Sequence, residues 1–201
     1  MNALSVHKIS EGLKLSEWKK KRTVKHRYDI TAGIYDARYA EEQTAKIEVA
    51  MENIHLDKNS LVLDAGCGTG LLFSYVADKA KTVVGLDISK KSLLKARGRS
   101  KSYRNVHLIL ADADCMPFRD GMFNSVFAMT LIQNTPDPAR TLSEMKRVAT
   151  DDALLAVTGL KRYFSKVAFE MLLGDTALGI VGFEDGEDLR CHVAVCVKIH
   201  H

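Results

Sequence analysis

The stretch LVLDAGCGTG, residues 61–70, decides the fold predicted for this chain of 201 residues. Its first four residues have the apolar composition of a short buried strand, and the strand ends on an acid, Asp64. Glycines follow at alternate positions, Gly66, Gly68 and Gly70, and a helical pattern begins after them. Glycine lets the backbone turn sharply and approach a ligand closely, because no Cβ intervenes. The stretch therefore predicts a strand, a ligand-binding loop and a helix in succession.

Apolar strand patterns and helical patterns alternate along the rest of the chain. Further strands are predicted at 82–86, 106–110, 123–129 and 153–158, and helices at 71–80, 90–97, 137–148 and 164–173. Strands separated by helices form parallel βαβ units with right-handed crossovers. Residues 189–199 alternate with period two, which favours an antiparallel hairpin with residues 180–183 and leaves His192 on a less buried face. The prediction is an α/β fold: a doubly wound, mostly parallel, seven-stranded Rossmann-like sheet with a C-terminal antiparallel hairpin.

Charged residues are distributed unevenly along the chain. Residues 1–27 carry eight Lys/Arg and two acids, although the whole chain has a formal net charge of only +4. We expect a basic N-terminal arm over 1–27 and one domain over 28–201, in which residues 28–55 form a helix or lid. A second basic run covers residues 90–104, which contain no acid. Such runs are usually solvated helix faces, but two of them together could follow a nucleic-acid backbone.

Composition excludes several classes of protein. No apolar run reaches the roughly 20 residues of a membrane-spanning helix, and the first residues lack the apolar core of a signal peptide. Four scattered cysteines without a CxxC pair argue against a disulfide framework or a zinc site. Cys191 and Cys196 are an odd number of residues apart on a strand, so they point to opposite faces and cannot bind one metal together. We expect a soluble, cytoplasmic protein without a metal or a membrane contact.

Acids stand at the ends of three successive predicted strands. Asp64 ends the first, Asp87 the second, and Asp112 follows the third. A strand-end aspartate is usually a cap or turn residue, but three of them meet at the carboxyl edge of one sheet, where such folds bind ligands. An acid placed like Asp87 can accept hydrogen bonds from both ribose hydroxyls, and Asp112 can accept one from an adenine amino group. The acids predict a binding site for an adenosine ligand.

With these motifs the chain resembles the class I S-adenosylmethionine-dependent methyltransferases. Residues 64–70 are similar to their glycine loop, 84–87 to their ribose-binding strand end and 111–113 to their adenine-binding turn. The resemblance runs from about Tyr28 to the C-terminus and implies S-adenosylmethionine as the cofactor. The implied cofactor contacts are Asp64, Gly66, Cys67 (through its backbone N–H), Gly68, Gly70, Asp87, Ile88, Asp112, Ala113 and Met129. A dinucleotide oxidoreductase fits less well, because the third glycine of its motif would fall at Leu71.

The motifs indicate the acceptor of the methyl group less specifically than they indicate the cofactor. Residues 134–137 match only two positions of the Asn-Pro-Pro-aromatic motif of amino-methylating relatives, which disfavours an adenine base or a glutamine amide. The substrate or lid residues are predicted to be Tyr28, Tyr35, Arg38, Gln133 and Asn134. Among these, Arg38 could pair with the methionine carboxylate of the cofactor, and a tyrosine could pack near its sulfonium. No histidine is suitably placed, so no general base is assigned.

A small-molecule acceptor is the favoured hypothesis. The alternatives are an RNA acceptor bound through residues 1–27 and 90–104, a protein acceptor, or a methyltransferase-fold subunit that depends on a partner or has no catalytic role. A partner subunit or a homodimer remains open.

Overall fold

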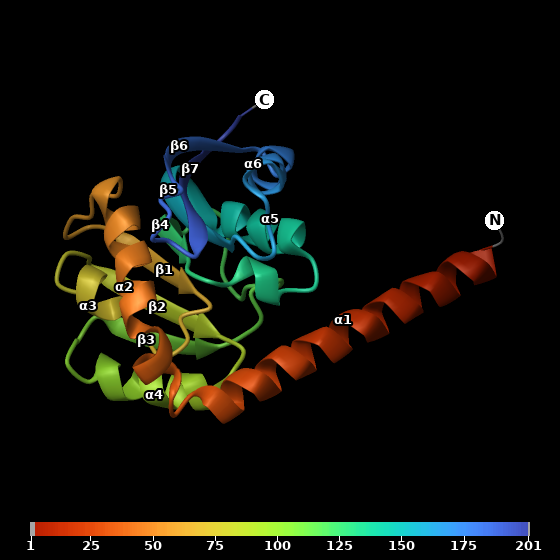
Figure 1. Cartoon of the computed structure of the whole chain (residues 1–201), viewed down its shortest axis with the longest axis horizontal. Coiled ribbons are helices and arrows are strands. Elements are labelled where there is room, and N and C mark those ends of the chain that lie inside the picture. Colours follow the sequence, from red (N-terminus) through yellow and green to blue (C-terminus); the bar gives the residue numbers. More distant parts are fainter. Residues whose placement is uncertain (1–2, 201) are drawn as a thin grey trace.

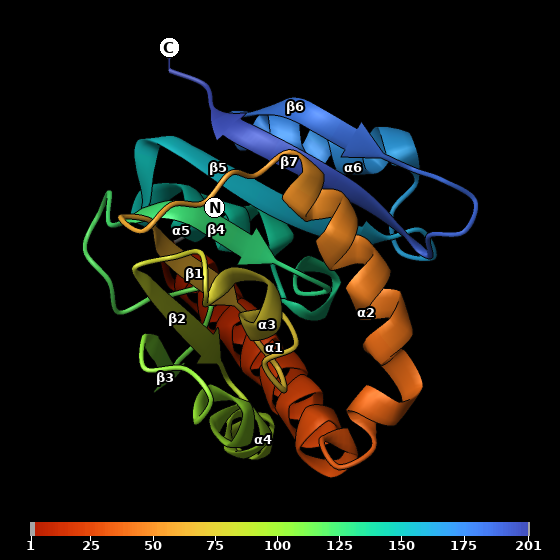
Figure 2. The ribbon, with the colours of Figure 1, turned by 90° about the vertical axis from the view of Figure 1, so that its left-hand side faces the viewer.

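A seven-stranded mixed sheet forms the centre of the molecule. The computed structural model describes residues 3–200, with side chains from Leu15 onward. The strands are β1 (Leu61–Ala65), β2 (Thr82–Asp87), β3 (Val106–Leu110), β4 (Phe123–Ala128), β5 (Ala149–Leu160), β6 (Leu178–Glu184) and β7 (Cys191–Lys198). They lie in the order β3-β2-β1-β4-β5-β7-β6 (Figure 2). The first five are parallel and β7 runs antiparallel to both neighbours, which confirms the predicted fold class.

Helices cover both faces of this sheet. They are α1 (Ala3–Thr31), α2 (Tyr35–Glu52), α3 (Phe73–Val76), α4 (Lys90–Ser100), α5 (Pro138–Val148) and α6 (Lys166–Asp175), with a 3₁₀ turn η1 (Ile132–Asn134). Side chains of α2, α3 and α4 pack on one face, and those of α5 and α6 on the other (Figure 1). Neighbouring strand residues such as Val62 and Leu63 enter opposite cores, because side chains alternate along a strand.

The last strand is buried on both faces, which corrects the prediction of a more exposed face. β7 lies between β5 and β6, and α2 packs against it. His192 is only 4% exposed: its Nδ1 lies 2.8 Å from Asp185 Oδ1 and its Nε2 lies 3.0 Å from the Phe164 carbonyl. These two partners satisfy the ring nitrogens and allow a polar residue in the core. Cys191 and Cys196 enter opposite cores, as the spacing predicts.

The N-terminal residues form one long helix. α1 continues through positions 27 and 28, where the sequence suggests a boundary between an arm and a domain. Its N-terminal half extends away from the body of the molecule, while its C-terminal part lies beside α4 (Figure 1). No helix between residues 3 and 200 has the length and apolar character needed to span a bilayer.

Two further boundaries differ from the sequence pattern. The helix expected over 71–80 is reduced to the single turn of α3, which is followed by turns. β5 begins at Ala149, earlier than expected, and its first residue pairs with Phe123 of β4 across a bulge. Neither difference moves the carboxyl edge of the parallel strands, where the predicted site residues lie.

Candidate cofactor and acceptor site

The glycine loop has the backbone conformation that its composition predicts. Gly68 and Gly70 have φ values of +54° and +82°, a region that side chains other than glycine rarely adopt. A Cβ on Gly70 would lie 2.4 Å from the Phe73 ring, so glycine is also required there by packing. A Cβ on Gly68 would meet nothing within 4 Å, because this residue borders open space. The loop therefore turns tightly against the core and leaves Gly68 next to a cleft.

The first N–H groups of the loop are held within the protein. Those of Gly66 and Cys67 both donate to the carbonyl of Leu86, at 2.7 and 2.9 Å. This corrects the expectation that the Cys67 N–H serves the ligand. The Cys67 thiol is buried, and this burial raises its pKa well above the usual cysteine value. Cys67 is therefore a packing residue at the base of the loop.

Asp87 connects the end of β2 to the glycine loop. Its Oδ2 accepts a hydrogen bond from the Gly68 N–H at 2.9 Å, and its Oδ1 accepts one from the Ser89 N–H at 2.7 Å. Burial raises the pKa of Asp87 above the usual aspartate value, although these two N–H groups act in the opposite direction. Asp87 is thus fixed in orientation at the edge of the cleft.

Asp64 is the most deeply buried of the three acids. It lies on β1 between Gly85 of β2 and Phe127 of β4, and it is 2% exposed. Burial, with the nearby charge of Asp87, raises the pKa of Asp64 to about 8. The carboxyl group therefore carries a proton at neutral pH, and a cation bound beside it would favour its ionisation.

Asp112 is bound by a residue of α1. Lys21 Nζ lies 2.6 Å from Asp112 Oδ2 and 2.8 Å from Asp114 Oδ2. Burial alone would lower the pKa of Lys21, but its hydrogen bonds to the two acids outweigh this and raise it. The Asp112 Oδ1 accepts from the Asp114 N–H at 3.0 Å. Sequence reasoning missed Lys21 and Asp114.

Lys21, Asp112 and Asp114 line a first cavity of about 750 Å³, open solvent included. Its walls include Gly66, Gly68, Asp87, Ile88, Asp112, Ala113 and Met129 among the predicted cofactor residues. Asp64 and Cys67 line a smaller adjoining space that shares Gly66, Gly68 and Met129 with it. Most of the predicted cofactor residues thus line these two adjoining spaces. Gly70 borders neither space, since it packs against Phe73.

Two tyrosines and Asn134 form another part of the wall of the first cavity. Asn134 Nδ2 donates to the Tyr28 hydroxyl at 3.0 Å and to the Thr130 carbonyl at 2.7 Å. The rings of Tyr28 and Tyr35 lie 6.0 Å apart, between their centroids. Burial raises the pKa of both phenols, so both stay protonated at neutral pH.

Thr130 is a strained residue between this wall and the sheet. It follows β4 with a φ of +63°, which is unusual for a β-branched side chain. Its hydroxyl accepts from Gln43 Nε2 at 3.0 Å and from Lys46 Nζ at 3.2 Å, and its N–H donates to Thr158 Oγ1 at 2.7 Å. Such strain persists where surrounding bonds impose it, and it concentrates at functional sites. No sequence signal marked Thr130.

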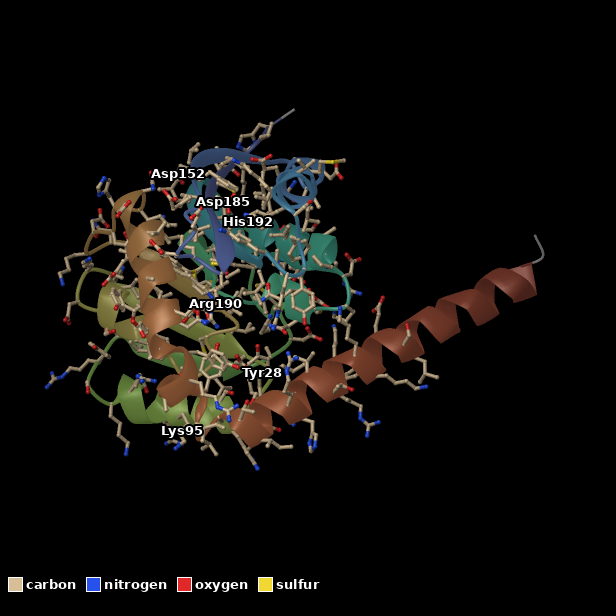
Figure 3. The ribbon with its side chains drawn as sticks, viewed as in Figure 1. Tyr28, Lys95, Asp152, Asp185, Arg190 and His192 are labelled. Carbon is tan, nitrogen blue, oxygen red and sulfur yellow. The ribbon has the colours of Figure 1, made fainter. Side chains whose placement is uncertain are left out.

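A second cavity opens next to the first and shares Tyr28, Tyr35, Thr130 and Asn134 with it. It has about 1350 Å³, open solvent included. Tyr28 and Arg190, both in its lining, lie on the same side of the molecule (Figure 3). Arg38 lines this cavity and not the first one. Gln133, a predicted substrate or lid residue, is buried and lines neither cavity, and its side-chain amide has no partner among the described residues.

Comparison with known proteins agrees with this geometry. Residues 63–157, which include the glycine loop, Asp87 and Asp112, match the methyltransferase domain family. The matched residues begin within β1 and end within β5, so the match does not include the hairpin strands β6 and β7.

Relatives extend the likeness beyond the methyltransferase domain. A malonyl-[acyl-carrier protein] O-methyltransferase of Marinomonas sp. (strain MWYL1) is 32% identical over 130 residues, or 64% of this chain. The chain spans about half the length of that relative, 48%.

Two solved structures share the fold. The S-adenosylmethionine-dependent methyltransferase from Aquifex aeolicus has a TM-score of 0.75 at 18% identity, over 85% of this chain and 98% of that one. A methyltransferase of Haloferax volcanii in complex with the Trm112 methyltransferase activator has a TM-score of 0.71 at 18% identity, over 86% of this chain and 98% of that one. Both likenesses extend over most of the chain.

Proposed function

We propose that this protein binds S-adenosylmethionine in the first cavity and transfers its methyl group to a small molecule. The observation that carries this proposal is the joint position of the glycine loop and Asp87 on one cleft, with Gly68 N–H and Asp87 Oδ2 2.9 Å apart. The chemistry of this cleft fits the cofactor. Asp87 offers carboxylate oxygens to ribose hydroxyls, and the protonated Asp64 can ionise beside an ammonium group.

The cofactor supplies an electrophilic methyl group on a sulfonium, which a nucleophile takes by in-line displacement. The protein's part in such a reaction is alignment and exclusion of water. Tyr28, Tyr35 and Asn134 stand at the junction of the two cavities, and their mutual contacts fix their positions. α1 covers the adenine end through Lys21, so its C-terminal part helps to close the cleft.

A small acceptor is favoured because α1 and α2 both line the second cavity, directly beside the proposed cofactor cleft. The relative from Marinomonas is named as an O-methyltransferase of malonyl-[acyl-carrier protein]. A nucleic-acid acceptor has weaker support, since several basic side chains of the two runs are already engaged. Lys21 binds Asp112 and Asp114, Lys25 binds Asp29, and Arg99 binds Asp36. An activator subunit is the second candidate arrangement, because the Haloferax neighbour is seen in such a complex.

Calorimetry with S-adenosylmethionine and its demethylated product tests cofactor binding. We expect both to bind the full chain, and no binding by folded protein would contradict the proposal. Radiolabelled methyl transfer into a fractionated cell extract then identifies the acceptor class. Label in small molecules supports the proposal. Label confined to RNA or protein would replace it with a macromolecular acceptor.

A further inference from the structure

The second cavity has a strongly positive lining. Five cations and one acid contribute to it: Arg27, Arg38, Lys161, Arg162 and Arg190, with Glu42. They come from α1, α2, the turn after β5 and the segment before β7, so four separate parts of the chain bring positive charge to one place. We expect the cavity to bind a ligand of opposite charge, because like charges gathered at a pocket repel one another and destabilise the fold.

Two of these cations are already paired with acids. Lys161 Nζ lies 3.0 Å from Asp185 Oδ1, and Arg190 lies 3.8 Å from Glu42. Glu42 is itself engaged, since Lys46, which is fully buried, lies 2.6 Å from it. The only acid in the lining is therefore neutralised by two cations.

Three arginines remain without an acidic partner among the side chains that the structure describes. Arg27 donates to the neutral amide oxygen of Asn134 at 2.6 Å, and its guanidinium lies over the Tyr28 ring. Arg162 lies over the ring of Tyr163, and Arg38 is exposed at the cavity. A guanidinium with free N–H groups binds a carboxylate through two parallel hydrogen bonds.

The rest of the lining suits an apolar body attached to the anion. The ring of Tyr35 neighbours those of Tyr28 and Tyr39, with centroid distances of 6.0 Å and 5.0 Å, and all three tyrosines line the cavity. Aromatic walls of this kind bind planar or apolar groups by stacking and by burial of surface.

The lining offers no group that would take a proton from an acceptor at neutral pH. None of the described histidines lines the cavity, and the phenols of Tyr28 and Tyr35 are held in their protonated form. Glu42 is bound by Lys46. An acceptor that is ionised before it binds needs no general base, whereas an alcohol does.

We propose that the second cavity is the acceptor site and that it takes a carboxylic acid with an aromatic or apolar body, bound as its carboxylate by Arg38 and Arg162. This inference rests on the proposed function and names the substrate class for that site.

The probe is trans-cinnamate, compared with cinnamamide, which has the same shape without the charge. Both are titrated by calorimetry into the full chain saturated with the demethylated cofactor. We expect cinnamate to bind at least tenfold more tightly than cinnamamide, and its affinity to fall as the salt concentration rises. Equal affinity for the two compounds would overturn the inference.

Variants separate a specific site from general surface charge. In the double variant Arg38→Gln/Arg162→Gln we expect cinnamate affinity to fall at least tenfold while cinnamamide affinity is unchanged. Arg104→Gln removes one positive charge, as each of the two substitutions does, but from an exposed position that lines neither cavity, and it should change neither value. The lysine variant Arg38→Lys should retain part of the difference. A loss in Arg104→Gln as large as in the double variant would overturn the inference.

The design separates this inference from the proposed function. Binding of the demethylated cofactor is measured first on the same protein. If it does not bind, the proposed function fails. If it binds and cinnamate shows no preference over cinnamamide, the acceptor inference alone fails.

Discussion

The ammonium group of Lys21 lies 2.6 Å from the carboxylate of Asp112, although the two residues are 91 positions apart in the sequence. Lys21 also reaches Asp114, so one cation of α1 holds two acids that follow β3. This contact fastens α1 across the adenine end of the proposed cofactor cleft. Lys21 also occupies Asp112 Oδ2, the oxygen that would accept a hydrogen bond from an adenine amino group, and so it would compete with the cofactor.

Replacing Lys21 tests the structural side of this contact. Lys21→Met should lower the free energy of unfolding at pH 7 by about 1 to 3 kcal/mol, because two adjacent acids lose their shared cation. The pKa of Lys21 is raised in the folded protein. Its contribution to the free energy of unfolding is therefore fully present at pH values below the usual lysine pKa, and it is lost as the pH rises through the pKa that Lys21 has in the folded state. Urea unfolding measures the change. Lys19→Met, an exposed neighbour, should have an effect within about 0.5 kcal/mol.

The same variant tests the competition at Asp112. Lys21→Met should bind the demethylated cofactor several-fold more tightly, because Asp112 Oδ2 becomes available. Asp112→Asn should bind it more weakly, because its amide is a poorer acceptor than a carboxylate. Calorimetry compares the three proteins. If Lys21→Met weakens binding as much as Asp112→Asn does, Lys21 supports the cofactor and does not compete with it.

Asp87 should carry much of the cofactor affinity. Asp87→Asn keeps one acceptor oxygen but loses the charge, and we expect the dissociation constant to rise about 10- to 100-fold, or about 1.5 to 3 kcal/mol. Asp152→Asn, at an exposed position, is the matched control. Unchanged affinity in a folded Asp87→Asn protein would remove Asp87 from the site.

Asp64 makes stability depend on pH. Its pKa of about 8 lies above the unfolded value of 3.8, so the folded state binds an extra proton between these values and stability falls as pH rises through that window. The slope is at most about 1.4 kcal/mol per pH unit. Asp64→Asn cannot ionise and should lose this slope. Denaturant unfolding from pH 4 to 8 compares the two proteins, and parallel curves would show that Asp64 is ionised throughout.

Two substitutions of Thr130 distinguish the cost of its backbone strain from the contribution of its hydroxyl hydrogen bonds to stability. Thr130→Gly relieves a positive φ that costs about 1 to 3 kcal/mol, while it loses the bonds to Gln43 and Lys46. Thr130→Val loses the same bonds and keeps the strain, so it should be less stable than Thr130→Gly by about 1 kcal/mol or more. Thermal unfolding measures the order of the two variants, and the reverse order would show that φ at this position carries no strain.

Local sequence patterns predicted the sheet and the cluster of acids well. Asp64, Asp87 and Asp112 were found because parallel strands bring their ends to one edge, which holds for any packing of the side chains. Their roles toward the cofactor remain predictions.

Residues whose role depends on tertiary contacts were not visible in the sequence. Lys21 stands in a basic run that suggested a solvated arm, and only the folded chain brings it to Asp112. The positive φ of Thr130 follows from its hydrogen bonds to distant residues. The prediction that His192 lies on an exposed face was wrong. A polar residue in an alternating pattern suggests such a face, but here two specific partners satisfy the ring nitrogens and allow His192 to be buried.

The position of β7 has a consequence for synthesis of the chain. β7 is the last of the seven strands along the sequence, yet it fills the place between β5 and β6. Until it emerges from the ribosome, the 12-residue β5 of a nascent chain has an unpaired edge, and β6 has no neighbour at all. Exposed apolar strand edges pair with other chains. A nascent chain that has not yet added β7 therefore exposes the edge of β5 to pairing with other chains.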